Sequence, residues 1–137
     1  METTKAIPML DTKALSGIWR STYRYTSSGR DNQEFEGQHY VRAHSQGRRL
    51  VFESVPDSKS YVLIRLSFDG EAATGSWEEQ TDPNGYYKGA TYYGAIQFMV
   101  TKDGKGLSGK WAGFGKEGDV NTGPWRLEYI GEALPAA

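Results

Sequence analysis

The sequence predicts an all-β protein, a single eight-stranded antiparallel up-and-down barrel, and three observations support this prediction. Eight segments alternate apolar and polar side chains with the period of two that is typical of half-buried strands. The segments are joined by stretches rich in turn-forming residues, as in a meander of hairpins. Seventeen glycines, nine tyrosines, five phenylalanines and four tryptophans leave little of the 137 residues with a helical pattern. Eight strands can close into a barrel with a filled or ligand-sized interior.

The expected strands follow one another along the chain. The first, residues 16–25, places Trp19, Tyr23 and Tyr25 on one face. The remaining seven are residues 33–43, 48–55, 61–68, 72–80, 89–101, 106–114 and 122–130. Asp69-Gly70 and Asp103-Gly104 are hairpin signals, because glycine accepts the positive φ of a tight turn. We expect one barrel domain over residues 15–131, between an N-terminal lead-in (1–14) and a frayed tail (132–137).

The connections between the expected strands differ in length and composition. Those after the second, fourth and sixth strands are short, whereas those after the first, fifth and seventh are long and rich in glycine, aromatic and charged residues. In a meander, these two sets lie at opposite ends. We therefore expect a closed end and an open mouth, with odd-numbered strands running towards the mouth.

All four tryptophans stand in one local frame, in which a hydroxyl residue, a glycine and any residue precede the indole. The frames are Ser16-Gly17-Ile18-Trp19, Thr74-Gly75-Ser76-Trp77, Ser108-Gly109-Lys110-Trp111 and Thr122-Gly123-Pro124-Trp125. Positions two apart in a strand share a face, so each glycine is expected to remove bulk beside its own tryptophan. We expect Trp19 deep in the barrel, Trp77 and Trp111 midway and Trp125 near the rim. Each ring is either core filler or part of a ligand cavity.

Charge and composition exclude several function classes. Sixteen basic and 17 acidic side chains nearly cancel, so we expect no duplex nucleic acid and no membrane as partner. The chain has no cysteine and only two histidines, so we expect no metal site and no other cofactor. No segment has the pattern of a signal peptide or a membrane span, and we expect a cytoplasmic protein. Whether the barrel is a monomer or a homo-oligomer is left open.

Parts of the chain resemble the calycin superfamily, the lipocalin and streptavidin-like barrels. The Gly-x-Trp at Gly17-Ile18-Trp19 is similar to the opening of their first strand, and residues 74–78 and 107–113 resemble strand segments of the streptavidin group. In that group a further strand follows the segment that residues 121–125 resemble. The chain ends here instead, so we do not expect a biotin site to carry over.

A closer resemblance is to a barrel domain found C-terminal to helix-turn-helix regulators in actinobacteria. It rests on residues 15–19 with Ser21, Tyr23 and Tyr25, on 73–77, on 85–90 with 92–97, on 109–111 and 113–115, and on 120–123 with Trp125. The resemblance implies a bacterial sensory or effector-binding barrel. Because the helix-turn-helix part is missing, DNA binding does not follow. Tyr93 stands where the resemblance leads us to expect histidine.

The candidate site lies at the expected mouth. Residues 85–94 bring together four tyrosines, one lysine and three glycines, which suits an aromatic and anionic ligand. With inward residues of other strands, the candidate ligand-binding residues are Tyr23, Tyr25, Trp77, Glu79, Tyr86, Tyr87, Lys88, Tyr92, Trp111, Phe114, Asn121 and Trp125. The alternative is a structured lid whose tyrosines pack on one another.

Two inward polar residues need partners. A carboxylate facing a cavity is costly when unpaired, so we expect an arginine or lysine of a neighbouring strand beside Glu79. His39 shares a face with apolar side chains and is expected to be a hydrogen-bonded core residue, not a base or a ligand. His44 is expected in a solvated turn.

These features predict a non-catalytic barrel that binds a small molecule with an apolar or aromatic ring, oriented by tyrosine hydroxyls and a mouth lysine, with nucleotide-like compounds as a specialisation. One alternative is a cofactor-free cyclase or pericyclase that shapes its substrate in an aromatic cavity. Another alternative is a protein-interaction domain that uses the mouth loops. No catalytic residue is assigned.

Overall fold

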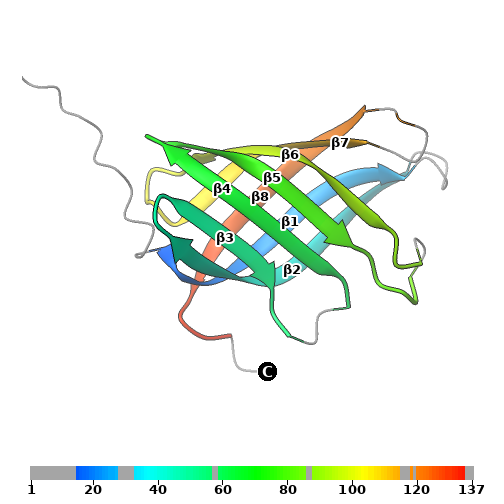
Figure 1. Ribbon diagram of the computed structural model, residues 1–137, viewed down its shortest axis with the longest axis horizontal. Coiled ribbons are helices and arrows are strands. Elements are labelled where there is room, and N and C mark those ends of the chain that lie inside the picture. The colour runs from blue at the N-terminus through cyan, green and yellow to red at the C-terminus, as the bar shows by residue number, and fades with distance from the viewer. Residues whose placement is uncertain are drawn as a thin grey trace, which may run out of the picture.

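The computed structural model is a closed antiparallel barrel of eight strands, which confirms the predicted fold (Figure 1). It describes residues 15–27, 33–56, 59–85, 88–114, 118 and 120–134. The strands are β1 (Gly17–Ser27), β2 (Gln33–Gln46), β3 (Arg49–Ser54), β4 (Tyr61–Asp69), β5 (Ala72–Gln80), β6 (Thr91–Val100), β7 (Gly106–Phe114) and β8 (Val120–Gly131). Each strand pairs with the next one, and β8 pairs with β1 to close the sheet. The lead-in over residues 1–14 and the last three residues of the tail lie outside the described residues.

The strand bounds agree with the sequence pattern except near some ends. The strand β2 continues to Gln46 and therefore includes His44, which was predicted in a turn. His44 is exposed on this strand, and its Nε2 lies 3.4 Å from Oε1 of Glu53 on β3. The prediction of a turn was wrong because residues 44–46 still pair with β3, and the connection needs only Gly47 and Arg48.

The short connections lie at one end of the barrel, as predicted (left in Figure 1). The β2–β3 and β4–β5 connections each have two residues, and Gly47 (φ 68°) and Gly70 (φ 64°) supply the positive φ that these turns require. The strands β1, β3, β5 and β7 end at the other end of the barrel, and the strands that follow them begin there (right in Figure 1). We call this second end the mouth, and the described residues of the candidate site lie towards it.

The apolar face of every strand points into the barrel, where the side chains form one core. Trp19 is 0% exposed, contacts Phe52 and Tyr129 edge-on at 5.5 Å between ring centroids, and donates from Nε1 to the Leu15 carbonyl at 2.8 Å. This position confirms the expectation that Trp19 lies deep. The other members of the core are Leu15, Tyr23, Val41, Ala43, Leu50, Phe52, Val62, Ile64, Leu66, Ala73, Trp77, Ile96, Phe98, Leu107, Trp111, Trp125 and Leu127.

The glycines that make room for aromatic rings act across strands. A Cβ on Gly113 would lie 2.8 Å from Cζ2 of Trp77, and one on Gly123 would lie 2.9 Å from Nε1 of Trp111. The expectation that each glycine relieves its own tryptophan was therefore wrong for these two rings. For Trp111 the physical reason is distance, because Gly123 lies directly opposite it, and directly opposed residues have Cβ atoms about 5 Å apart, whereas residues two apart along a strand are about 6.6 Å apart. Trp77 instead reaches across Gly94 on β6 to Gly113 on β7.

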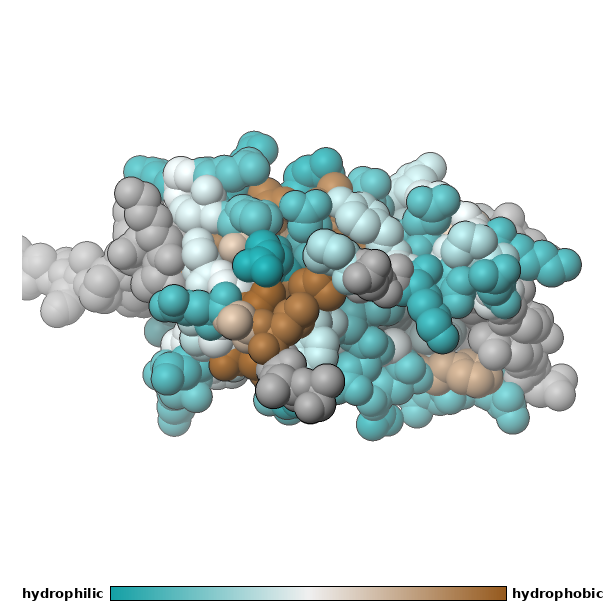
Figure 2. Space-filling model, turned by 90° about the horizontal axis from the view of Figure 1, so that it is seen from below, coloured by the Kyte–Doolittle hydropathy of each residue, from teal (hydrophilic) through white to brown (hydrophobic). Residues whose placement is uncertain are grey.

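The outer face is mostly hydrophilic. Seen from below in Figure 2, a large hydrophobic area and a smaller one at the lower right interrupt a largely polar surface. Among the described residues, the large hydrophobic side chains that are exposed are Tyr61, Tyr93, Met99, Phe114, Val120 and Leu134. The described part of the chain contains no helix with the length and hydrophobicity that a membrane crossing requires.

Candidate functional site

Three polar side chains meet inside the barrel near the mouth. The Tyr23 hydroxyl donates to Oε2 of Glu79 at 2.6 Å and lies 3.3 Å from Nε2 of His39. The His39 Nε2 is 4.0 Å from the same carboxylate oxygen. Because β5 neighbours neither β1 nor β2, these contacts span the lumen. We call Tyr23, His39 and Glu79 the carboxylate cluster.

A glycine explains why Tyr23 reaches across the lumen. Gly37 on β2 lies directly opposite Tyr23 on β1, and a Cβ at this position would overlap the tyrosine ring. Without that Cβ, the ring leans over β2 and stacks on the imidazole of His39, with 5.8 Å between centroids and 20° between planes. The hydroxyl then points at Glu79.

Burial sets the protonation of the cluster. The side chains of Glu79 and His39 are each only 15% exposed. Burial raises the pKa of Glu79, and the hydrogen bond from Tyr23 lowers this pKa in part. Burial lowers the pKa of His39, so this imidazole is held in its neutral form. Both shifts reflect a site in which charge is disfavoured.

The expected cationic partner of Glu79 is not found among the described residues. No described arginine or lysine lies within 4.0 Å of its carboxylate, and a tyrosine hydroxyl and a neutral histidine stand in that place. The expectation failed because the arginines of neighbouring strands occupy the outer face, where Arg65 pairs with Glu78 at 3.7 Å. Oε1 of Glu79 accepts no hydrogen bond from any residue that the structure describes.

Three indoles pack beside the carboxylate cluster, and we call Trp77, Trp111 and Trp125 the indole cluster. Ring centroids are 5.5 Å apart for Trp77 and Trp111, and 5.7 Å apart for Trp77 and Trp125. Tyr23 lies 4.7 Å from Trp125 and so joins the two clusters. Trp77 and Trp111 are 7% exposed, in agreement with a position midway, but Trp125 is only 2% exposed and lies deeper than the rim position expected.

Every indole N–H of this cluster is satisfied by the protein. Trp77 donates to the Ala95 carbonyl at 3.1 Å, Trp111 to the Arg24 carbonyl at 3.0 Å, and Trp125 to Oγ of Ser21 at 2.8 Å. The rings are therefore fixed in orientation. They offer apolar faces, not hydrogen-bond donors, to any molecule in the lumen.

Several other predicted site residues lie at the same end of the barrel. Tyr25 is half-buried and stacks on Phe35 at 5.7 Å. Tyr92 is half-buried and directly opposite Glu79 across the β5–β6 pair. Asn121 is exposed at the rim, opposite Gly113. Tyr25 contacts Tyr23 of the carboxylate cluster at 5.9 Å between ring centroids, and Tyr92 packs against the core.

Phe114 and Lys88 are not brought to the clusters. Phe114 is 64% exposed and lies on the outer face beside Val120, because the preceding Gly113 faces inward. Lys88 is exposed in the β5–β6 connection with a positive φ of 55°. Tyr86 and Tyr87 lie outside the described residues.

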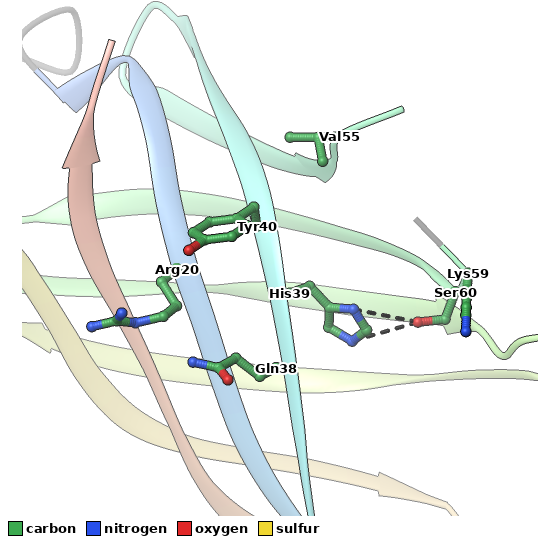
Figure 3. A pocket seen from close by; sticks show the side chains of 7 residues that line it. All are labelled: Arg20, Gln38, His39, Tyr40, Val55, Lys59 and Ser60. Atoms are coloured by element: carbon green, nitrogen blue, oxygen red, sulfur yellow. Dashed lines mark hydrogen bonds between the residues drawn. The ribbon is translucent and has the colours of Figure 1, made fainter. Parts of the chain in front are cut away.

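A pocket of about 490 Å³ opens in the barrel wall where β2 and β3 separate (Figure 3). The pairing of these strands ends at Val41 and Ser54, leaving space between β2 and the β3–β4 connection. Residues on both sides of β2 line the pocket: Arg20, Gln38, His39, Tyr40, Val55, Lys59 and Ser60. Oγ of Ser60 lies 3.4 Å from Nδ1 of His39, so the histidine connects this pocket to the carboxylate cluster.

The sequence did not single out His39, Gly37 or Ser60 as parts of a site. The inward position of His39 was visible from the strand pattern, but the partners that give it a role come from other strands. Ser60 follows a turn and carries no pattern that would distinguish it. Among the described residues, no group of three or more histidine, aspartate or glutamate side chains could hold a metal ion.

Comparison with known proteins gives no assignment for this barrel. No family model, no curated protein and no solved structure matches the chain.

Proposed function

We propose that this protein is a non-catalytic barrel that binds a small ring-bearing molecule in its mouth. The observation that carries the proposal is the carboxylate cluster, a hydrogen-bonded Tyr23–Glu79 pair 2.6 Å apart that crosses the lumen beside the indole cluster. Apolar ring faces with a few converging polar groups are the usual chemistry of a small-molecule site. A sensory or effector-binding role, and kinship with the calycin barrels, belong to the same proposal.

The apolar rings of the indole cluster and the polar groups of the carboxylate cluster together support a binding role. The indole N–H groups already have protein partners, so the rings contribute stacking area and Glu79 with His39 contribute orientation. Nucleotide-like compounds are one class with a ring of suitable size, and the exposed Lys88 at the mouth supports a test of that class.

A second candidate function is cofactor-free catalysis by proton transfer. Its specific support is the Tyr23 hydroxyl, which stands between Nε2 of His39 and the Glu79 carboxylate at 3.3 and 2.6 Å. A tyrosine placed in this way can pass a proton between a base and an acid. Time-resolved product analysis of every bound compound separates this function from simple binding.

Ligand-induced stabilisation tests the binding proposal. A ring-bearing metabolite panel should contain compounds that raise the melting temperature, since a ligand at 100 times its Kd adds about 2.7 kcal/mol to the free energy of unfolding. Trp111→Phe should weaken the effect, whereas Phe114→Ala on the outer face should leave it unchanged. A panel without any stabilising compound, over both one-ring and two-ring scaffolds, contradicts the proposal.

A further inference from the structure

In the part of the chain that the structure describes, no side chain supplies a compensating charge to the Glu79 carboxylate. Its neighbours in the lumen are Tyr23 on β1, His39 on β2, Val62 on β4 and Tyr92 on β6. None of these side chains carries a positive charge at neutral pH, because the one histidine among them is kept neutral by burial. Oε2 is occupied by Tyr23, while Oε1 has no hydrogen-bond partner among the described residues.

The aromatic surroundings favour a cation in the same place. The face of an aromatic ring is electrostatically negative and attracts a positively charged group within about 6 Å of its centroid. Trp77 shares the inner face of β5 with Glu79, and Tyr92 lies opposite on β6. The lumen therefore combines a buried carboxylate with ring faces, and both repel an anion and attract a cation.

We propose that the lumen ligand carries a protonated amine, which pairs with Oε1 of Glu79 while its ring packs on the indole cluster. This inference rests on the proposed binding function and names the chemical class of the ligand. The sequence had indicated an anionic ligand through the mouth lysine, but Lys88 is exposed in a connection, whereas Glu79 lies inside the barrel. Of these two charged groups, the Glu79 carboxylate is therefore the one that lies beside a ring bound inside the barrel.

Matched trios of probes test the inference. Each trio has one ring scaffold with an ethylamine, a neutral ethanol or a propionate side chain, for instance phenethylamine, 2-phenylethanol and 3-phenylpropionate, together with two-ring analogues. Titration calorimetry at pH 7.5 should give the amine at least about tenfold tighter binding than the alcohol, as a charge-assisted hydrogen bond provides. The propionate should bind more weakly than both.

Two glutamate variants test whether Glu79 causes the preference for the amine over the alcohol. Glu79→Gln should reduce the preference for the amine over the alcohol by about tenfold or more. Glu78→Gln changes the adjacent residue of β5, which pairs with Arg65 on the outer face, and should leave the preference unchanged. This pair controls for the loss of one negative charge anywhere on the protein.

The outcomes separate this inference from the proposed function. If the alcohols or the propionates bind as tightly as the amines, or if Glu79→Gln leaves the amine preference intact, the amine inference is wrong and the binding function stands. If no member of any trio binds, both are wrong. If both Glu78→Gln and Glu79→Gln weaken the amine equally, the attraction comes from net charge, and the inference is also wrong.

Discussion

Tyr23 is the residue that holds the interior polar groups together. Its ring stacks on His39, packs against Trp125, and directs its hydroxyl to Glu79. Burial alone would favour a protonated Glu79, and the hydrogen bond from Tyr23 works against that effect. The hydroxyl therefore matters most when the carboxylate is ionised.

Replacing Tyr23 by phenylalanine tests this role. A hydrogen bond to a charged group contributes about 1.5–3 kcal/mol, so Tyr23→Phe should lower the free energy of unfolding by roughly that amount at neutral pH. Urea denaturation at pH 7 and pH 4 measures the effect, which should shrink at the lower pH. Tyr61→Phe is the matched control, because Tyr61 donates to Glu53 at 3.0 Å on the exposed surface, where such a bond contributes little. Equal losses in both variants would contradict the role given to the buried bond.

The pH dependence of stability follows from the raised pKa of Glu79. Burial raises this pKa above the ordinary value of 4.5, so the folded state holds the proton more tightly than the unfolded state. Stability must then fall as the pH rises from 4.5 through the raised pKa. Glu79→Gln removes this loss, so its stability relative to the wild type should increase between pH 4 and pH 8. Chemical denaturation at a series of pH values measures this trend, and Glu78→Gln should stay parallel to the wild type.

The lowered pKa of His39 makes the stability of the protein depend on pH in the opposite direction. Its pKa is lowered from 6.5 by burial, so the folded state releases the proton more readily than the unfolded state. The contribution of His39 to the free energy of unfolding must therefore fall as the pH drops from 6.5 through the lowered pKa. His39→Asn should flatten the acid limb of the profile and leave the stability difference between pH 7 and pH 8 unchanged. A variant that loses stability equally at every pH would show that packing, not protonation, is the contribution of His39.

At the scale of elements, the strands fit together where one strand supplies a ring and another strand supplies a glycine. Trp77 on β5 lies against Gly113 on β7, beyond the intervening Gly94 on β6. Because the indole reaches across Gly94, which has no side chain, a methyl group at Gly113 would meet Cζ2 of Trp77 at 2.8 Å. The indole would have to move, and its bond to the Ala95 carbonyl would be strained or lost.

Gly113→Ala should consequently destabilise the barrel by about 1–3 kcal/mol, the usual effect of overpacking. Tryptophan fluorescence should shift as Trp77 moves, and denaturation gives the stability. Gly85→Ala is the control, because a methyl group there would come no closer than 3.4 Å to another atom. If Gly113→Ala matches the wild type in both stability and fluorescence, the close approach is not important.

The elements themselves could be predicted from the sequence, whereas the contacts between them could not. Alternation and turn residues locate all eight strands, since both signals are local in the chain. The partner of Glu79, in contrast, could not be predicted from local signals. Tyr23 lies 56 residues away, and its approach depends on the register that places Gly37 opposite it. A single sequence shows which residues face inward but not which of them meet.

The depth of an individual ring in the barrel could not be predicted from the sequence either. Trp125 was expected near the rim because it comes early in β8, yet it bonds to the buried Ser21 and is almost completely covered. Strand order along the chain gives only an approximate depth, because the strands of a closed barrel are tilted and staggered against one another. The depth of a ring depends on this stagger, and local pattern does not contain it.

At the scale of the molecule, the closure between β1 and β8 makes the two chain halves depend on each other. Trp125 and Ser21, joined by a hydrogen bond at 2.8 Å, are 104 residues apart in the sequence. Such distant pairing makes folding slow relative to helical proteins, because most of the chain must be ordered before the last strand docks. It also means that the core at the β1 edge is covered only when β8 is present.

A chain that ends at residue 119, and so lacks β8, should not fold. It loses Trp125 and Leu127, which fill the core, and uncovers β1 with Tyr23, so the carboxylate cluster loses its support. Circular dichroism and near-ultraviolet spectra should show neither a cooperative thermal transition nor fixed tryptophan environments. A chain ending at residue 131 keeps every strand, loses only residues beyond β8, and should unfold cooperatively near the wild-type temperature. If the shorter chain also unfolds cooperatively, seven strands suffice for a core, and the lumen that holds Glu79 does not depend on closure.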